Sequence, residues 1–288
     1  MNSTSENNRF YGNFSLSIRG EIYPLQRPQI LGILNVNDRS FYDGGRHNSV
    51  DKAVAHCAQL LEEGADFIDV GAVSTKPGSA LINAEDEWKQ LKPFLKELVQ
   101  SFPQARFSVD TYNSAVAEKA VETGAVLIND ISGGTLDSKM PEVIGKLKIP
   151  YILMHLKGTP ETMQNKAHYE NVVKEVAYYF SVQLDKFYAH GANDLILDLG
   201  FGFGKTSSHN FELLNHLAYF KTFFELPVLA GLSRKSMIYK NLDCSPDEAL
   251  NGTTVLNTLA LQQGADFLRV HDVKPAREAI KLVTLTQN

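Results

Sequence analysis

Four segments of the chain share one order of polar and apolar positions. In each of them a helix-like stretch ends at a glycine, a short apolar run follows, and a polar residue ends the run. Glycine takes the left-handed conformation that often ends a helix, and a short apolar run is typical of a buried strand. The glycines lie too far apart for one strand and one helix, but their spacing fits two of each. The segments begin at Glu62 (EEGADFIDVG), Glu122 (ETGAVLINDI), Ala189 (AHGANDLILDLG) and Gln262 (QQGADFLRVHD).

The strands that should lie between these segments each follow a proline, at positions 28, 103, 150 and 227. Proline ends a preceding helix and is tolerated where a strand begins. Together the two sets predict strands near residues 29–35, 67–70, 106–110, 126–130, 151–155, 194–198, 228–232 and 267–270. The intervening segments are long enough for helices, which we expect over residues 50–63, 83–102, 114–123, 168–189, 246–263 and 274–285.

Strands that alternate with helices and are apolar almost throughout are typical of a parallel sheet covered by helices. Eight such units predict an α/β fold of the TIM (β/α)8 barrel type. Residues 14–24 alternate in polarity around a glycine turn, which predicts a short N-terminal β-hairpin at the bottom of the barrel. We expect a single domain over residues 14–288, preceded by a disordered or loosely ordered N-terminus over residues 1–13.

Composition and charge exclude several classes of protein. The 288 residues carry 28 Lys and Arg against 33 Asp and Glu, a net charge of −5, whereas nucleic-acid-binding proteins need an excess of cations. Two cysteines are too few for a disulfide framework. No apolar run is long enough to span a membrane, and the first ten residues are polar. We therefore expect a cytoplasmic globular protein with small-molecule partners and with neither a nucleic-acid nor a membrane partner.

Polar residues end nearly every predicted strand. In a TIM barrel the active site lies at these carboxyl ends of the strands. A barrel without a site would carry scattered Ser, Thr and Gly there, so this many charged and amide groups indicate a functional site. The residues are Asn35, Asp69, Asp110, Asn129, Asp130, Met154, His155, Asp198, Ser233, Arg234, Lys235, Arg269 and His271.

Three of these residues have the chemistry to bind a flat heterocycle. Asp110, Asn129 and Asp198 could present carboxylate and amide groups to the N–H and C=O edges of a ring. The alternative is that they are helix caps or parts of a buried polar network that holds the barrel together.

A second set carries positive charge near the point where the barrel closes. Lys235, Arg269 and His271, together with Asn35, suit a phosphate or diphosphate group, because arginine offers a planar fork and lysine a point charge. A ring of ion pairs that serves stability is the alternative. The run after Asp198 lacks the first glycine of a phosphate-binding loop, and the histidines show no metal-ligand spacing.

A series of ordered motifs carries a resemblance to a known family. They are ILGILNV (Ile30–Val36), SFYDGGR (Ser40–Arg46), STKPG (Ser74–Gly78), SVDTY (Ser108–Tyr112), INDISGG (Ile128–Gly134), MHLKGTPETMQ (Met154–Gln164), GFGFGKT (Gly200–Thr206), GLSRKSMI (Gly231–Ile238) and RVHDV (Arg269–Val273). Over about residues 29–285 the chain resembles dihydropteroate synthases, the pterin-binding TIM barrels of folate biosynthesis. The resemblance implies a transferase, a target of sulfonamides, that condenses 6-hydroxymethyl-7,8-dihydropterin diphosphate with 4-aminobenzoate to give dihydropteroate and diphosphate. It also implies a homodimer and Mg²⁺ as cofactor.

The resemblance further implies which residues bind and catalyse. Those that would hold the pterin are Asp110, Asn129, Met154, Asp198 and Lys235. Those beside the aminobenzoate or in the second loop would be Thr75, Phe203 and Ser233. Those that would hold the diphosphate are Asn35, Arg269 and His271, with Asn35 also beside the metal ion. The catalytic set implied in this way is Asn35, Lys235, Arg269 and His271.

The departures from the family pattern lie in the two loops near the site. The first loop has Asn37, Asp38 and Arg39 where the family usually has Thr, Pro and Asp, and the second has Lys76 where the family has Arg. A working synthase with altered loops is the first interpretation. A pterin-diphosphate-binding paralogue with little activity, and a methyltransferase acting on a reduced folate, are the alternatives.

Overall fold

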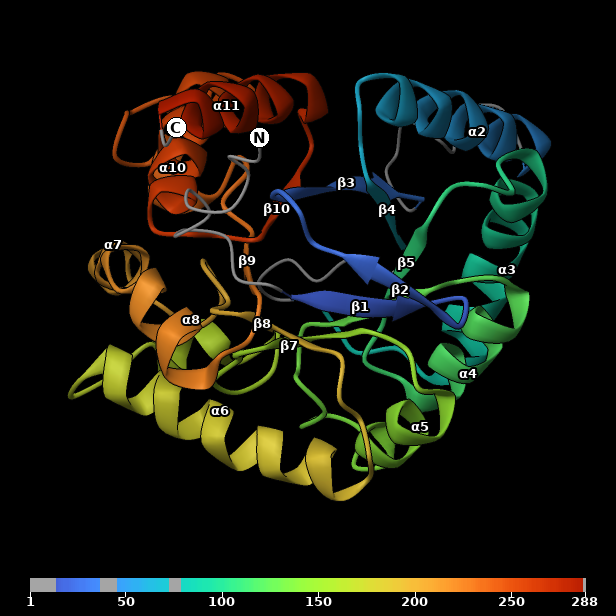
Figure 1. Ribbon diagram of the computed structural model, residues 1–288, viewed down its shortest axis with the longest axis horizontal. Coiled ribbons are helices and arrows are strands. Elements are labelled where there is room, and N and C mark those ends of the chain that lie inside the picture. Colours follow the sequence, from blue (N-terminus) through green and yellow to red (C-terminus); the bar gives the residue numbers. More distant parts are fainter. Residues whose placement is uncertain (1–13, 37–45, 73–78, 287–288) are drawn as a thin grey trace, which may run out of the picture.

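The computed structural model describes residues 14–36, 46–72 and 79–286. Eight parallel strands close into a barrel in the order β10-β3-β4-β5-β6-β7-β8-β9, and helices surround it (Figure 1). The predicted TIM barrel is therefore confirmed. The prediction of disorder for residues 1–13 and the positions of Thr75, Lys76 and the 37–39 segment lie outside the described residues, so they stay predictions.

The barrel strands lie where the glycine and proline pattern places them. They are β3 (Gln29–Asn35), β4 (Phe67–Gly71), β5 (Phe107–Asp110), β6 (Leu127–Asp130), β7 (Tyr151–Met154), β8 (Leu195–Asp198), β9 (Val228–Ala230) and β10 (Phe267–Val270). The glycines that precede them in the four related segments, at positions 64, 124, 191 and 264, all have positive φ. Each one ends a helix as the pattern predicts.

The helices include several that the sequence pattern did not predict. The helices are α2 (Arg46–Glu62), α3 (Ala84–Ser101), α4 (Ser114–Thr123), α5 (Met140–Leu147), α6 (Val172–Ala189), α7 (Ser207–Asn215), α8 (Leu217–Phe224), α9 (Ser236–Tyr239), α10 (Leu250–Gln262) and α11 (Val273–Thr286), with a 3-10 turn η1 (Met163–Lys166). The unpredicted α5, α7, α8 and α9 are short, and α5 contains Pro141 and Gly145. A glycine is required at position 145 although glycine is unfavourable in a helix. A Cβ at this position would lie 2.0 Å from the backbone oxygen of His190.

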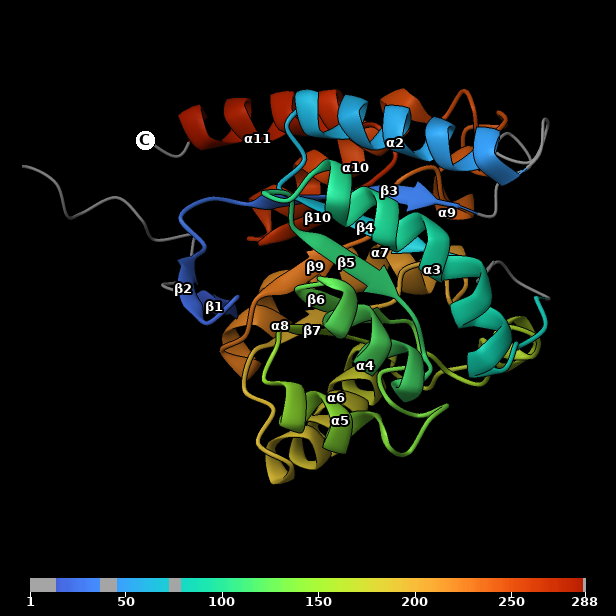
Figure 2. The same cartoon turned by 90° about the vertical axis from the view of Figure 1, so that its right-hand side faces the viewer.

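The N-terminal hairpin closes the barrel at the amino ends of the strands. Its strands β1 (Ser15–Ile18) and β2 (Glu21–Pro24) pair antiparallel and lie across the end that the arrowheads point away from (Figure 2). Leu16 and Ile18 pack against the side chains that fill the bottom layer of the barrel, among them Phe67 and Phe267. This confirms the predicted hairpin and places it at the end opposite the polar strand ends.

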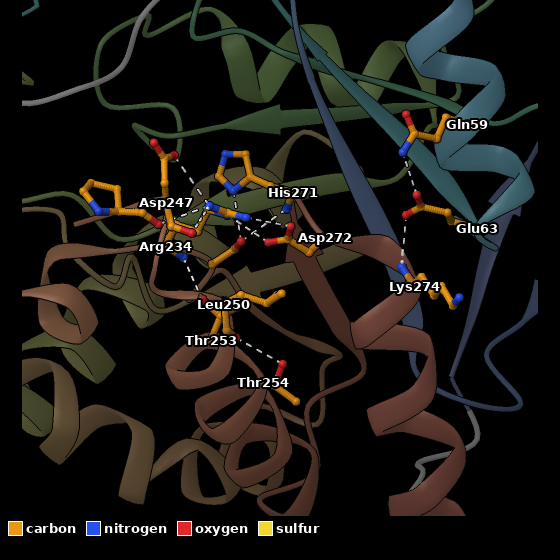
Figure 3. Close-up of polar contacts among 12 residues, drawn as sticks. Gln59, Glu63, Arg234, Asp247, Leu250, Thr253, Thr254, His271, Asp272 and Lys274 are labelled. Carbon is orange, nitrogen blue, oxygen red and sulfur yellow. Dashed lines mark hydrogen bonds and ion pairs between the residues drawn. The ribbon is translucent and has the colours of Figure 1, made fainter. Parts of the chain in front are cut away.

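The strand register brings the polar strand ends to one level. Asn35 pairs with Gly71, Gly71 with Asp110, and Asp110 with Asn129, across four neighbouring strands. Parallel strands end at the same edge of a sheet, so these groups gather although they lie far apart in the sequence. On the outer side, Glu63 accepts hydrogen bonds from Gln59 and from the backbone of Lys274, which joins α2 to α11 where the barrel closes (Figure 3).

Candidate active site at the carboxyl ends of the strands

A fully buried carboxylate lies at the centre of the polar cluster. Asp69 on β4 accepts hydrogen bonds from Ser108 Oγ at 2.6 Å, from Asn129 Nδ2 at 3.0 Å and from Arg269 Nε at 2.7 Å. The donors come from β5, β6 and β10. One side chain thus joins the group predicted to bind a heterocycle with the group predicted to bind an anion. The sequence pattern placed Asp69 at a strand end but gave it no role.

Arg269 contacts a second carboxylate as well. Its Nη2 atom donates to Asp110 Oδ2 at 2.9 Å, so the guanidinium lies between two buried acids. Burial raises the pKa of Asp110 to about 7, against the lowering effect of the Arg269 charge. Nη1 of Arg269 has no hydrogen-bond partner within the described ranges, so this end of the fork is left for a ligand.

Asp198 and Lys235 form the other side of the site. Asp198 Oδ1 accepts a hydrogen bond from the backbone of Gly200 at 2.8 Å, and burial raises the pKa of this acid. The Lys235 ammonium donates to the backbone oxygen of Phe201 and lies 4.8 Å from the centre of the Phe203 ring. Desolvation lowers the pKa of Lys235 to about 8, although the charge of Asp198 opposes this shift.

His271 lies at the rim, held by a neighbouring strand end. Ser233 Oγ lies 2.9 Å from His271 Nδ1 and accepts a hydrogen bond from the His271 backbone at 3.2 Å. Desolvation, followed by the charge of Arg269, lowers the pKa of His271 to about 4, although its side chain is exposed. The imidazole can act as a hydrogen-bond donor or acceptor at the edge of the site.

Arg234, between Ser233 and Lys235, points away from this cluster. Its guanidinium makes a two-point contact with Asp272, with both distances 2.9 Å, and also donates to the backbone of Asp247 (Figure 3). The backbone N–H of Arg234 bonds to Thr253 Oγ1 at 3.0 Å. Arg234 therefore fixes the loop after β9 against α10 and the end of β10, and it holds Ser233 and Lys235 in place.

A buried lysine holds the loop that follows Asp198. Lys205 Nζ lies 2.9 Å from His155 Nδ1 and 2.9 Å from the backbone oxygen of Gly200, and it also bonds to the Phe203 carbonyl at 3.0 Å. Burial lowers the pKa of Lys205 well below its usual range. Gly200 has φ +68°, and a Cβ there would lie 2.1 Å from the His155 oxygen, so only glycine fits. The GFGFGKT motif is thus a tight loop around an internal lysine.

A cluster of apolar side chains packs beside these polar groups. Met154, at the end of β7, lies in a buried cluster with partly buried Phe203 at its edge. The other buried members are Tyr112, Ile131, Leu156 and Met163, and partly buried Leu136 packs against them. A site with one apolar side, three acceptor-rich groups and two cations suits a flat polar ring that carries an anionic tail.

The structure also separates neighbours that the sequence placed together. Asp130 accepts hydrogen bonds from Tyr151 Oη at 2.6 Å, Ser132 Oγ at 2.7 Å and the Gly134 backbone at 3.0 Å, behind the strand and away from the pocket. Asp130 thus belongs to a buried polar network that stabilises the barrel. Asn129, the residue before it, belongs to the site through its bond to Asp69.

Asn35, the expected metal ligand, faces the same point as Asp110. Gly71 lies between the two residues in the strand register. A Cβ atom placed on Gly71 would lie 3.5 Å from Asn35 Oδ1 and 3.8 Å from Asp110 Oδ2. The Asn35 side chain makes no hydrogen bond within the described part of the chain. No cluster of three His, Cys, Asp or Glu side chains that could hold a metal occurs among the described residues. A magnesium ion here would therefore need further oxygen ligands from a substrate, as is usual for Mg²⁺ bound with phosphates.

Comparison with known proteins decides the family. The model of the family described as pterin binding enzyme matches residues 31–271. The chain belongs to this family. Dihydropteroate synthase of Escherichia coli is 41% identical over 273 residues, which cover 94% of this chain and 96% of that protein. The resemblance predicted from the motifs is thus confirmed, as is the class of enzyme, a transferase of folate synthesis that acts as a dihydropteroate synthase.

Solved structures of the family share both the fold and its extent. The Yersinia pestis dihydropteroate synthase in complex with a sulfonamide drug has a TM-score of 0.88 and 39% identity, covering 95% of this chain and 99% of that one. The Xanthomonas albilineans enzyme with 4-aminobenzoic acid has a TM-score of 0.87 and 36% identity, covering 95% and 98%. In the described residues of this pterin-binding barrel, no helix is long and apolar enough to cross a membrane.

Proposed function

We propose that the chain condenses 6-hydroxymethyl-7,8-dihydropterin diphosphate with 4-aminobenzoate, releasing diphosphate. The observation that carries the proposal is the position of Arg269, between the acceptor group of Asp110 and Asn129 and the rim residue His271, with Nη1 unpaired among the described residues. A ligand that satisfies both sides must join a hydrogen-bonding ring to an anion. A pterin diphosphate has this form.

The residues divide between the ring and the leaving group. Asp110, Asn129 and Asp198 accept hydrogen bonds from the ring edge, Lys235 donates to it, and Met154 packs against its face. Arg269, His271 and Asn35 receive the diphosphate, and Phe203 and Ser233 lie on the side from which 4-aminobenzoate approaches. Thr75 completes this set from the second loop, outside the described residues.

The chemistry follows from where charge develops. As the C–O bond to diphosphate breaks, Arg269 stabilises the negative charge on the leaving group and His271 donates a hydrogen bond to it. Positive charge develops on the pterin methylene, and the buried carboxylates Asp110 and Asp198 stabilise that charge at close range. The arylamine nitrogen then attacks this carbon and loses a proton. Its conjugate acid is strongly acidic, so the site needs no dedicated general base.

Magnesium is part of the proposal, with Asn35 as its protein ligand. Asn35 Oδ1 has no hydrogen-bond partner among the described residues, so it could bind the ion, and substrate diphosphate would supply further oxygen ligands. When bound, the ion would neutralise charge on the diphosphate. Calorimetry with inorganic diphosphate, with and without Mg²⁺, tests this role. We expect Asn35→Ala to remove most of the Mg²⁺-dependent gain in affinity, and an unchanged gain would contradict it.

Release of diphosphate separates a synthase from a binding paralogue. We expect purified protein with pterin diphosphate, 4-aminobenzoate and Mg²⁺ to release diphosphate and to form dihydropteroate in equal amounts. Calorimetry on the same samples gives the affinity for each substrate. Tight pterin binding without release would favour the paralogue, and it would mean that the changes at Asp38 and Arg39 have removed the chemistry. Transfer of a methyl group from a reduced folate would favour the third interpretation.

We also propose that the chain forms a homodimer through α10 and α11. A groove of about 690 Å³ lies between these helices, lined by Leu250, Thr254, Thr258 and Leu282 among others. Apolar side chains are exposed on the same two helices, namely Leu250, Val255, Leu259, Leu282 and Leu285. A face of this kind is typical of a surface that a second copy covers.

Light scattering tests the dimer directly. We expect a molar mass of two chains, and a single chain after Val255→Glu combined with Leu282→Glu, because two buried charges per copy would oppose association. Ile22→Glu combined with Phe223→Glu is the matched control, since both residues are exposed elsewhere on the barrel. A monomer in the wild type, or a dimer that survives the first pair of changes, would exclude this interface.

A further inference from the structure

We propose that Asp69 is a positioning residue that sets the orientation of both Asn129 and Arg269 toward the ligand. The inference rests on the proposed function and adds to it a residue with no assigned role. Asp69 is 0% exposed and is enclosed by Ser108, Asn129 and Arg269, so it acts through these neighbours and not by touching the substrate.

The first effect concerns the amide of Asn129. A carboxylate can only accept hydrogen bonds, so the Asn129 atom that lies 3.0 Å from Asp69 Oδ2 must be the amide nitrogen. The amide oxygen then lies on the other side of the group. Asp69 thus makes Asn129 an acceptor toward the pocket, alongside Asp110 and Asp198. This selects a ring edge that carries N–H donors.

The second effect concerns the guanidinium of Arg269. Its Nε atom bonds to the same oxygen, Asp69 Oδ2, at 2.7 Å, while Nη2 bonds to Asp110 at 2.9 Å. Two contacts made by different nitrogens to different acids fix the plane of the guanidinium, and Nη1 has no partner among the described residues. A guanidinium fixed in this way loses less freedom when an anion binds.

Asp69 itself is held from the neighbouring strand. Ser108 pairs directly with Asp69 in the register of β4 and β5, and its hydroxyl donates to Oδ1 at 2.6 Å. Oδ1 therefore anchors the carboxylate, and Oδ2 receives both functional donors. The two oxygens of the Asp69 carboxylate therefore bind different partners. Mutation can separate the effect of the Asp69 negative charge from its effect on the orientation of Asn129 and Arg269.

Three variants test the inference in steady-state kinetics. Asp69→Ala removes the acceptor. Asp69→Asn keeps an oxygen at the Oδ2 position, because its amide nitrogen can donate to Ser108, whose hydroxyl then accepts. Ser108→Ala leaves both functional donors bonded. We expect the KM for pterin diphosphate to rise about a hundredfold in Asp69→Ala, and to stay within about fivefold of wild type in the other two. The KM for 4-aminobenzoate should change less than about twofold in all three, because Asp69 does not orient that subsite.

The outcomes are distinct from those that test the function. Absence of turnover and of pterin binding in the wild type would overturn the proposed function and this inference together. With an active wild type, only the inference is tested. Equal increases in both KM values would indicate a general loss of structure and overturn it. So would an Asp69→Asn variant that loses pterin binding a hundredfold, because charge and not orientation would then be decisive. That result stands even if Asp69→Ala fails to fold.

Discussion

Arg269→Lys should lower kcat/KM for pterin diphosphate by about a thousandfold, which corresponds to about 4 kcal/mol. Arg269 donates to Asp69 and to Asp110 from two different nitrogens of one planar group, and its third nitrogen, Nη1, has no partner among the described residues. A lysine ammonium is a point charge on a flexible stem, and it cannot bond both acids while it faces the diphosphate. Steady-state kinetics with diphosphate release as the readout measures this loss.

Arg277→Lys is the matched control for this change. Arg277 on α11 also contacts a carboxylate and a backbone oxygen, those of Asp66 and Gly64, but it lies beside the start of β4. We expect kcat/KM to stay within about threefold of wild type, with a small loss of stability. If Arg269→Lys retained more than a tenth of the wild-type kcat/KM, the fork would not be needed, and the proposed diphosphate contact would be wrong.

The pH profile of kcat/KM for pterin diphosphate should be bell-shaped and narrow, with limbs near pH 7 and pH 8. Burial raises the pKa of Asp110 to about 7, so below that pH the acid becomes protonated and loses an acceptor for the ring. Desolvation lowers the pKa of Lys235 to about 8, so above that pH the side chain loses its charge and one donor. The pH dependence of kcat/KM reports the pKa values of groups in the free enzyme. Because one group titrates on each limb, kcat/KM should fall about tenfold per pH unit beyond it.

Substitutions at Lys235 separate the two limbs. Lys235→Arg should move the alkaline limb to higher pH, since arginine stays protonated throughout this range. Lys235→Met should abolish that limb and lower the maximum by about a hundredfold, because the donor is removed and buried Asp198 loses the nearby positive charge of Lys235. The ionisation of the substrate is the same for every variant, so it cancels in the comparison. An alkaline limb that persists in Lys235→Met would show that another group titrates there.

The order of elements could be predicted from the sequence because their boundaries are marked by local chemistry. Glycines at helix ends and prolines before strands act within a few residues, and their conformational preferences do not depend on the rest of the fold. The strands at Gln29–Asn35 and Phe67–Gly71 were placed in this way. Short helices such as α5 were missed because Gly145, which is unfavourable in a helix, is required there by contact with His190 across the fold.

The site was predicted in part, for a reason that lies in barrel geometry. All the strand ends of a parallel barrel meet at one end, so the polar residues that terminate strands could be gathered from the sequence alone. The resemblance to the family then assigned expected roles to Asp110, Asn129, Asp198, Lys235 and Arg269. Lys205 was missed because a lysine in a glycine-rich loop is ordinarily exposed, whereas here the loop closes around its ammonium group.

The sequence by itself determined the barrel, its hairpin and the end of the barrel at which the polar strand ends gather, because these depend on local conformation and on alternation along the chain. The tertiary structure decided which of two adjacent acids or amides faces the pocket. Strands buried on both faces are apolar on both, so alternation in β6 could not show that Asn129 points inward and Asp130 outward. It also decided that Asp69 joins Asn129 to Arg269, since these partners come from three strands and meet only when the barrel closes.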